Sequence, residues 1–162
     1  MNTKNIKKPE MSPALLESNK LFKEFNNIYH DAALKLGISN SSLDILYSIC
    51  ELGDGCLQRD ISKSTFIPKQ TIHSSIRSLE KLGYIYLSNG KGRNMHINLT
   101  DAGRDYIKET IYPIITLENE AISSLTEDER RQMLILQSKH ITALREAFNK
   151  IKNHEEAEYR LK

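Results

Sequence analysis

In the N-terminal part of the chain, apolar side chains recur every three or four residues, as they do on one face of an amphipathic helix. After a polar tail, this pattern predicts one long helix from about Ser12 to Leu36, ended by Gly37. A second helix, SSLDILYSICEL, is expected to follow, with Asn40 or Ser41 as its cap. Its side chains expected to be largely buried are Leu43, Ile45, Leu46, Ile49 and Cys50.

In the middle of the chain the pattern changes from helical spacing to alternation. A short helix from about Gln58 to Ser64 precedes a helix that Pro68 opens and that runs to Leu82. The segments YIYLS and MHINL then alternate as two antiparallel strands do, with a turn at residues 89–92 between them. Helix, turn, helix and hairpin are the outline of a winged helix-turn-helix, which places its second helix in the DNA major groove.

Two further helices are predicted after the hairpin. Thr100 is suited to cap a helix from Asp101 to about Ser124, in which Pro113 is expected to cause a kink. Residues 126 and 129 form a T-x-x-E capping box, which opens the last helix. That helix has a seam spaced like a coiled coil, which predicts either a partner subunit or packing against the first helix of the same chain. The seam consists of Ile141, Leu144, Phe148 and Ile151.

These elements together predict a mainly α fold with a small antiparallel β wing. Residues 1–11 are expected to be a flexible tail, and residues 37–100 a winged helix-turn-helix DNA-binding domain. Residues 12–36 and 101–162 are expected to form a helical dimerisation region. The chain of 162 residues is 39% apolar, which is enough for a core without metal or disulfide. It contains no long apolar run, so we expect a soluble, cytoplasmic protein that does not enter a membrane.

Charge is distributed unevenly along the chain. Between Cys56 and Thr100, seven Lys and Arg stand against two acidic residues, a balance of +5, whereas the whole chain carries +2 and the remainder therefore −3. A basic block in a mildly acidic molecule suits a surface that binds a polyanion such as double-stranded DNA, although an ordinary solvated surface has the same appearance.

The helix from Pro68 to Leu82 has two distinct faces. Its apolar positions share one stripe, and polar or basic residues lie opposite. On the polar face, Gln70 suits an adenine edge, and Lys69 can donate to guanine or to a phosphate. The other candidate DNA-binding residues of this helix are Thr71 and Ser74 for phosphates and Arg77 for the DNA backbone. His73 is a further candidate for contact with DNA.

The tip of the hairpin carries two further cations. The always-charged side chain of Arg93 can enter an A·T-rich minor groove, where the negative potential is greatest. Lys91 is expected to add a phosphate contact.

Two segments resemble the MarR family of bacterial transcription regulators. IPKQTIHSSIRSLEKLGYI is similar to the family's recognition helix with its closing L-E-x-x-G, and GRNMHINLTDAG is similar to the wing strand that ends in L-T-x-x-G. The resemblance covers about residues 36–103 and, by the order of helices, nearly the whole chain. It departs from the family's pattern at Leu57, Ser74 and Lys91, so base specificity cannot be copied from a relative.

The resemblance implies a homodimer that represses transcription from a pseudo-palindromic operator and is released by a small, often aromatic, effector. Tyr29, His30 and Tyr47 can line a crevice for such an effector, or they can be core and hydrogen-bonded surface residues. No cofactor is expected.

Other functional classes are a regulator controlled by a metal or by oxidation, a module that binds protein and, least supported by the sequence, an enzyme. The sequence has no nucleophile elbow, P-loop, dinucleotide fingerprint or paired-carboxylate motif, so an enzyme is not predicted. Regulation by a metal would need clustered ligands, but the five histidines are scattered. Cys50 and Cys56 are either buried bystanders or a redox switch. A winged-helix module that binds protein in place of DNA is a further alternative.

Overall fold

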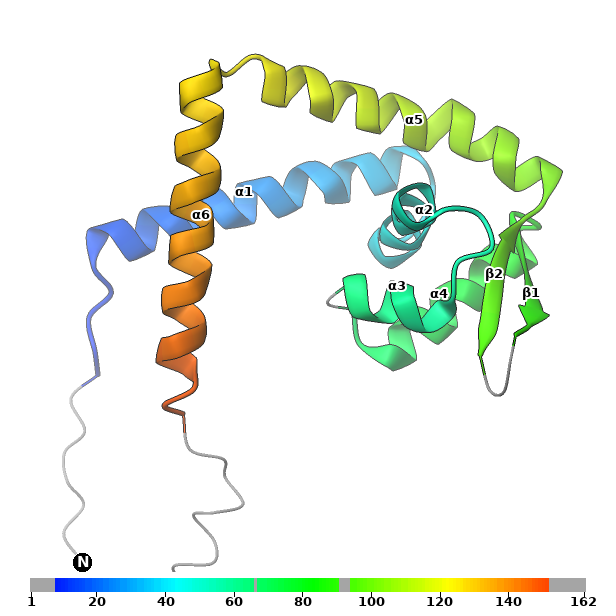
Figure 1. Ribbon diagram of the computed structural model, residues 1–162, viewed down its shortest axis with the longest axis horizontal. Helices are drawn as coiled ribbons and strands as arrows, with labels where there is room; N and C mark the ends of the chain where they lie inside the picture. Colours follow the sequence, from blue (N-terminus) through cyan, green and yellow to red (C-terminus); the bar gives the residue numbers. More distant parts are fainter. Residues whose placement is uncertain (1–7, 66, 91–93, 152–162) are drawn as a thin grey trace, which may run out of the picture. The chain divides into compact units, whose positions relative to one another are not determined.

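The computed structural model describes residues 8–65, 67–90 and 94–151 of the chain. Within these ranges it is mainly α-helical with one antiparallel pair of strands, so the predicted fold class is confirmed (Figure 1). The elements are α1 (Pro13–Lys35), α2 (Asn40–Leu52), α3 (Gln58–Ser64), α4 (Lys69–Lys81), β1 (Ile85–Asn89), β2 (Met95–Leu99), α5 (Asp101–Ser123) and α6 (Glu127–Phe148). The chain divides into two compact units, Met1–Pro113 and Ile114–Lys162.

The N-terminal ends of α1 and α2 are set by serine caps. The hydroxyl of Ser12 accepts from the backbone N–H of Leu15 at 3.2 Å. At α2 the predicted caps, Asn40 and Ser41, were wrong, because both already lie inside the helix. The cap is Ser39, whose backbone is extended and whose hydroxyl accepts from the N–H of residue 42. A cap must have this non-helical backbone, and α1 ends early enough to let residue 39 adopt it.

The caps predicted for the last two helices are confirmed. The Thr100 hydroxyl accepts from the backbone N–H of Gly103 at 2.9 Å at the start of α5. At α6, Thr126 and Glu129 form the reciprocal capping box, in which each side chain accepts from the other residue's backbone N–H. α5 continues through Pro113 as one helix, and the kink expected there stays a prediction.

The core of the first unit lies where α2, α3 and α4 pack together beside the strand pair (Figure 1). Each of these helices contributes branched aliphatic side chains, and the start of α5 adds two more. Of the residues expected to be buried in α2, all are in the core except Cys50, which is half-buried. Side chains that are essentially inaccessible include Ile45, Leu46, Ile49, Ile61, Ile72, Ile76, Leu79, Ile97, Ile107 and Ile111.

The strand pair forms the wing, and it is joined to the segment before α3. β1 and β2 pair in register from Ile85 opposite Leu99 to Asn89 opposite Met95. A separate β-bridge joins Leu57 to His96 on β2. The wing therefore shares backbone hydrogen bonds with the segment before α3, which fixes β2 beside the start of that helix.

Large apolar side chains remain exposed on α1 and α6. On α1 the exposed side chains include Leu15, Leu16, Leu21, Phe22, Phe25 and Ile28. None of the residues of α6 is buried, and its exposed apolar side chains are Leu134, Ile135, Leu136, Ile141, Leu144 and Phe148. Within the described ranges, no helix is both long enough and apolar enough to cross a membrane.

Candidate nucleic-acid interface

The helix α4 is divided lengthwise into a buried and an exposed face. Ile72, Ile76 and Leu79 are no more than 1% exposed, and they attach the helix to α2 and β1. Ser75 on the same face is also buried, and its hydroxyl pairs with that of Ser41 at 2.7 Å. The hydrophobic stripe predicted from the sequence therefore fixes the orientation of the opposite face.

The exposed face of α4 carries all six of the candidate residues that the sequence assigns to this helix. They are Lys69, Gln70, Thr71, His73, Ser74 and Arg77. The Ser74 hydroxyl donates to the carbonyl of Thr71 at 2.8 Å, so its proton is engaged within the helix and its oxygen is left to accept. His73 is held by a side chain of α3, since Gln58 Nε2 lies 3.0 Å from its Nδ1.

An open groove runs along this face, between α3, α4 and the start of β2. Its volume is about 470 Å³, and it is lined by Leu57, Gln58, Arg59, Ser62, Lys63, Lys69, Ile72, His73, Asn94 and Met95. Arg59 is paired with Asp60 at 3.4 Å, whereas the other two cations form no ion pair within the described ranges. The groove therefore carries an excess of positive charge without a protein anion to neutralise it.

The N-terminus of α4 opens on the same side. Pro68 precedes the helix, and no described side chain caps its first turn. The first backbone N–H groups of a helix have no intrahelical partner and carry part of the positive end of the helix dipole. Together with Lys69, they make this end of α4 suited to an anion such as a phosphate.

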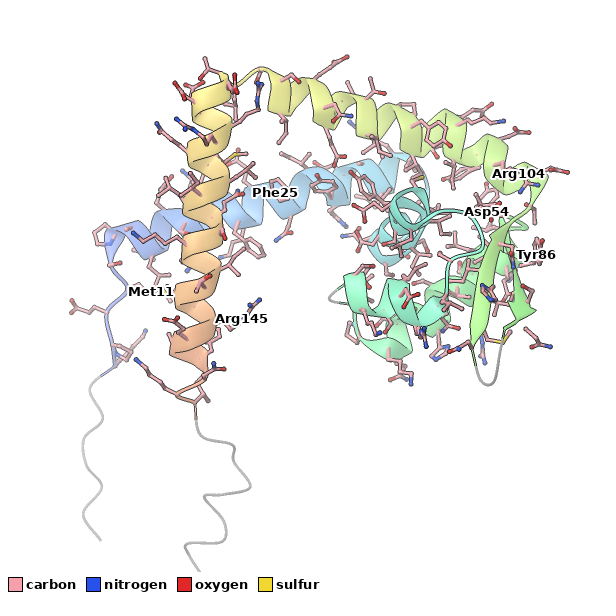
Figure 2. All side chains as sticks on the ribbon, viewed as in Figure 1. Met11, Phe25, Asp54, Tyr86, Arg104 and Arg145 are labelled. Atoms are coloured by element: carbon pink, nitrogen blue, oxygen red, sulfur yellow. The ribbon has the colours of Figure 1, made fainter. Side chains whose placement is uncertain are left out.

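A hydrogen-bonded cluster that the sequence did not reveal fixes the base of the wing. Asp54, in the turn after α2, accepts from the backbone N–H of Leu99 at 2.7 Å and from Arg104 at 3.1 Å. Arg104 also donates to the carbonyl of Leu99 and to Asp101. Figure 2 shows Asp54 and Arg104 meeting where β2 ends and α5 begins. The cluster ties three segments together, and it spans 45 to 50 residues of sequence, which no local pattern reports.

Both wing-tip candidates, Lys91 and Arg93, lie outside the described residues. The structure therefore gives the position of the two strands that lead to them and nothing of their side chains.

The three candidate effector residues do not share one cavity. A hollow of about 370 Å³ between α1 and α2 is lined by Phe25, Asn26, Tyr29, Asn40, Leu43 and Asp44. Tyr29 borders it and packs against Phe25, with 5.2 Å between ring centroids. His30 is exposed and hydrogen-bonded to Asn40, a residue of the lining, at 3.0 Å. Tyr47 is half-buried farther along α2 and is not part of the lining.

The cysteines and histidines give little support to the alternative sensors. Burial raises the pKa of both thiols, Cys50 and Cys56, and nearby carboxylates add to the effect. A raised pKa lowers the fraction of reactive thiolate. Among the described residues no group of three or more metal-ligating side chains occurs.

Comparison with known proteins adds sequence and fold evidence. Residues 36–93 match the model of the MarR family. No curated protein matches the sequence. Among solved structures, MepR of S. aureus, in complex with DNA, is 23% identical, with a TM-score of 0.66 over 83% of this chain and 99% of that one.

Two other solved structures agree with this match. A MarR family regulator from Neisseria meningitidis is 17% identical, with a TM-score of 0.69 over 84% of this chain and 96% of that one. A MarR transcriptional regulator from Methanosarcina mazei is 19% identical, with a TM-score of 0.61 over 84% and 93%. The resemblance to the MarR family is thus confirmed, in sequence over residues 36–93 and in fold over most of the chain, which has the winged-helix fold of the family's transcription regulators.

Proposed function

We propose that the protein is a sequence-specific DNA-binding transcription regulator that acts as a homodimer. The observation that carries the proposal is the exposed face of α4, on which polar and basic side chains stand opposite a fully buried apolar stripe. A helix held in this way can enter the major groove without losing any contact with its own core. The DNA bound by MepR in its complex supports the same use of the fold.

Five of the six candidate residues on the exposed face take these roles in DNA binding. Gln70 reads an adenine edge, because its amide can donate to N7 and accept from the N6 amine. Lys69 at the start of α4 contacts a guanine or a phosphate, and Thr71 and Ser74 fix the register on phosphates. Arg77, one turn farther along α4, contacts the sugar-phosphate backbone of the DNA. At the wing tip, Arg93 enters the minor groove and Lys91 contacts a phosphate.

Dimerisation is supported by the apolar side chains that α1 and α6 leave exposed. On α1, Phe22 is 67% exposed and Ile28 63%, and on α6 Leu136 is 63% exposed and Phe148 64%. Large exposed apolar patches on a soluble protein mark sites of interaction with another protein. A second copy of the chain would cover these helices and would present two copies of α4 at a spacing of roughly 34–36 Å, the repeat of B-DNA. The preferred operator is therefore pseudo-palindromic.

Release from DNA by a small aromatic effector completes the proposal, with the protein acting as a repressor. The hollow between α1 and α2 is the best-placed site, since it combines Phe25 and Tyr29 with the carboxyl group of Asp44. Partial burial raises the pKa of Asp44, so its carboxylate gains from a hydrogen-bond donor such as a phenolic hydroxyl. To act, the effector must bind the DNA-incompetent arrangement more tightly than the competent one.

The test is selection of bound fragments from random DNA, followed by measurement of affinity against salt. We expect a selected sequence with two-fold symmetry and a logarithmic salt slope of about −0.9 for each phosphate contacted. The Gln70→Ala variant should lose the preference for adenine at one position of each half-site and keep the slope. Lys108→Ala removes a cation that is already paired with Asp105 on α5, and it serves as the matched control that changes neither.

The result that would overturn the proposal is an unaltered, folded protein that selects no sequence and whose interaction with DNA does not depend on salt. The effector step is tested separately. Phenols that release the selected DNA should lose this effect in Asp44→Ala or Tyr29→Ala, and a loss that is confined to variants outside the hollow would contradict its assignment.

A further inference from the structure

We propose that Gln58 fixes the protonation of His73 so that this side chain acts as a hydrogen-bond donor that reads guanine in the major groove. This inference rests on the proposed function, since it assigns a base contact to the exposed face of α4. It makes His73 a specificity-determining residue and makes Gln58, on the neighbouring helix, the residue that positions it.

The contact joins the two helices of the helix-turn-helix. Gln58 is the first residue of α3, and His73 lies on the exposed face of α4. The distance between the Gln58 amide nitrogen, Nε2, and the His73 ring nitrogen, Nδ1, is 3.0 Å. Both residues line the groove between α3, α4 and the wing, together with Lys69. The pair therefore lies on the surface that the proposed function directs toward DNA.

The chemistry of the two nitrogens determines which one carries the proton. An amide nitrogen can donate a hydrogen bond but cannot accept one, so Nδ1 of His73 must be the acceptor. A neutral imidazole has one donor and one acceptor nitrogen, and its proton must then be on Nε2. Among the described residues, no protein group pairs with Nε2, and the side chain is exposed. The neutral ring therefore offers an N–H donor to whatever enters the groove.

A fixed donor discriminates between bases. In the major groove guanine presents two neighbouring acceptors, N7 and O6, whereas cytosine presents an amino group that can only donate. An N–H donor at the position of His73 thus favours guanine and disfavours cytosine on the strand it faces. Without Gln58, the ring could exchange its proton between the two nitrogens, and an unprotonated Nε2 would accept from cytosine. Gln58 removes that ambiguity without touching DNA itself.

The first experiment measures the proton directly. Two-bond ¹H–¹⁵N correlation spectra of the full-length protein at pH 8 distinguish protonated from bare ring nitrogens. The His73 signals are assigned by their loss in His73→Ala. We expect a protonated Nε2 and a bare Nδ1 in the unaltered protein. In Gln58→Glu, the carboxylate can only accept, so the proton should move to Nδ1. The inference would be overturned by a protonated Nδ1 in the unaltered protein, or by a proton that stays on the same ring nitrogen in Gln58→Glu.

The second experiment measures the base preference on the DNA selected by the unaltered protein. Each base pair is inverted in turn, and affinities are compared for the unaltered protein, His73→Ala and Gln58→Glu. At one position in each half-site, the unaltered protein should prefer guanine over cytosine by about fivefold, the worth of one hydrogen bond. His73→Ala should lose this preference. Gln58→Glu should lose or reverse this preference for guanine. The double variant Gln58→Glu/His73→Ala should have the same base preference as His73→Ala alone.

This double variant separates the effect of the His73 tautomer on base preference from the effect of the added negative charge, which weakens binding to every sequence alike. His73→Gln is the rescue variant, because its amide places a donor near the position of Nε2 and should restore part of the preference. A His73-dependent position that prefers cytosine, or the absence of any such position, would overturn the inference. Both results leave DNA binding and its salt slope intact, so they are distinct from failure of the proposed function, in which the unaltered protein selects no sequence.

Discussion

Among replacements of the described glycines by alanine, Gly103→Ala should cause the largest loss of stability of the first unit. Gly103 is buried in the first turn of α5, against the residue that precedes β1. A Cβ atom at this position would lie 1.8 Å from the carbonyl oxygen of Tyr84 and 2.8 Å from its carbonyl carbon. Ordinary contacts of a Cβ begin at 3.4 Å, so the two backbones must separate by about 1.6 Å. Neither partner is a side chain that can rotate away.

The magnitude follows from three contributions. Overpacking against a rigid backbone costs about 3 kcal/mol, the upper part of the usual range. The carbonyl of Tyr84 also accepts from the backbone N–H of Thr100, and loss of that hydrogen bond adds about 1 kcal/mol. Alanine favours a helix over glycine by about 1 kcal/mol, which offsets part of the cost. The expected decrease in the free energy of unfolding is therefore about 3 kcal/mol.

Urea unfolding followed by circular dichroism, at one fixed protein concentration, measures this decrease. Gly37→Ala is the matched control, because it adds the same methyl group where nothing lies within 4 Å but where φ is +68°. That variant should lose only about 1–2 kcal/mol, the cost of a left-handed backbone. Combining Gly103→Ala with Tyr84→Ala should restore nothing, since the obstructing atoms belong to the backbone. The reasoning is refuted if Gly103→Ala is as stable as the unaltered protein or loses less than Gly37→Ala.

Three smaller predictions concern a helix cap, the thiols and the wing. Thr126→Ala should lower the free energy of unfolding by about 1 kcal/mol in the same urea assay. Hydrogen bonds from Thr126 hold the pKa of Glu129 below its usual 4.5. The stability that they contribute is therefore present above pH 4.5 and is lost as pH falls through the lowered value. A Thr126→Ala variant whose free energy of unfolding depends on acidic pH as that of the unaltered protein does would contradict this cause. Cys50 and Cys56 should react with a thiol reagent at pH 7 more slowly than free cysteine does, because burial raises the pKa of both, and rates equal to those of free cysteine would refute that cause. Arg93→Ala should weaken DNA binding strongly without a change in the circular dichroism spectrum, and unchanged affinity at moderate salt would remove its minor-groove role.

Local patterns in the sequence predicted the elements of the fold well. The short helix Gln58–Ser64 was predicted with the bounds it has, and the capping box at Thr126 was recognised from two residues. Such features depend on neighbours within four positions, so a single sequence contains their cause. The error at α2 arose because several polar residues in a row can serve as a cap, and the choice depends on where the backbone becomes extended.

Contacts between distant segments could not be predicted in this way. The candidate residues on α4 were found because one hydrophobic stripe identifies the opposite face. Gln58 was missed, since nothing near it in sequence indicates that residue 73 will lie 3.0 Å away. The same holds for Asp54 and Arg104, which lie 50 residues apart in the sequence and are hydrogen-bonded at 3.1 Å. Sequence thus indicated which face of α4 is available, and the structure indicated what holds and orients its side chains.

The claim that two copies of α4 read DNA is tested most directly by 7-deazapurine interference on the selected operator, in which the major-groove N7 acceptor of an adenine or a guanine is replaced by a C–H group. We predict two patches of major-groove interference in each operator, centred about 10 base pairs apart and related by two-fold symmetry. Gln70→Ala should lose the interference at adenines within both patches, and Lys108→Ala should keep it. A single patch, or patches that Gln70→Ala leaves unchanged, would contradict the account.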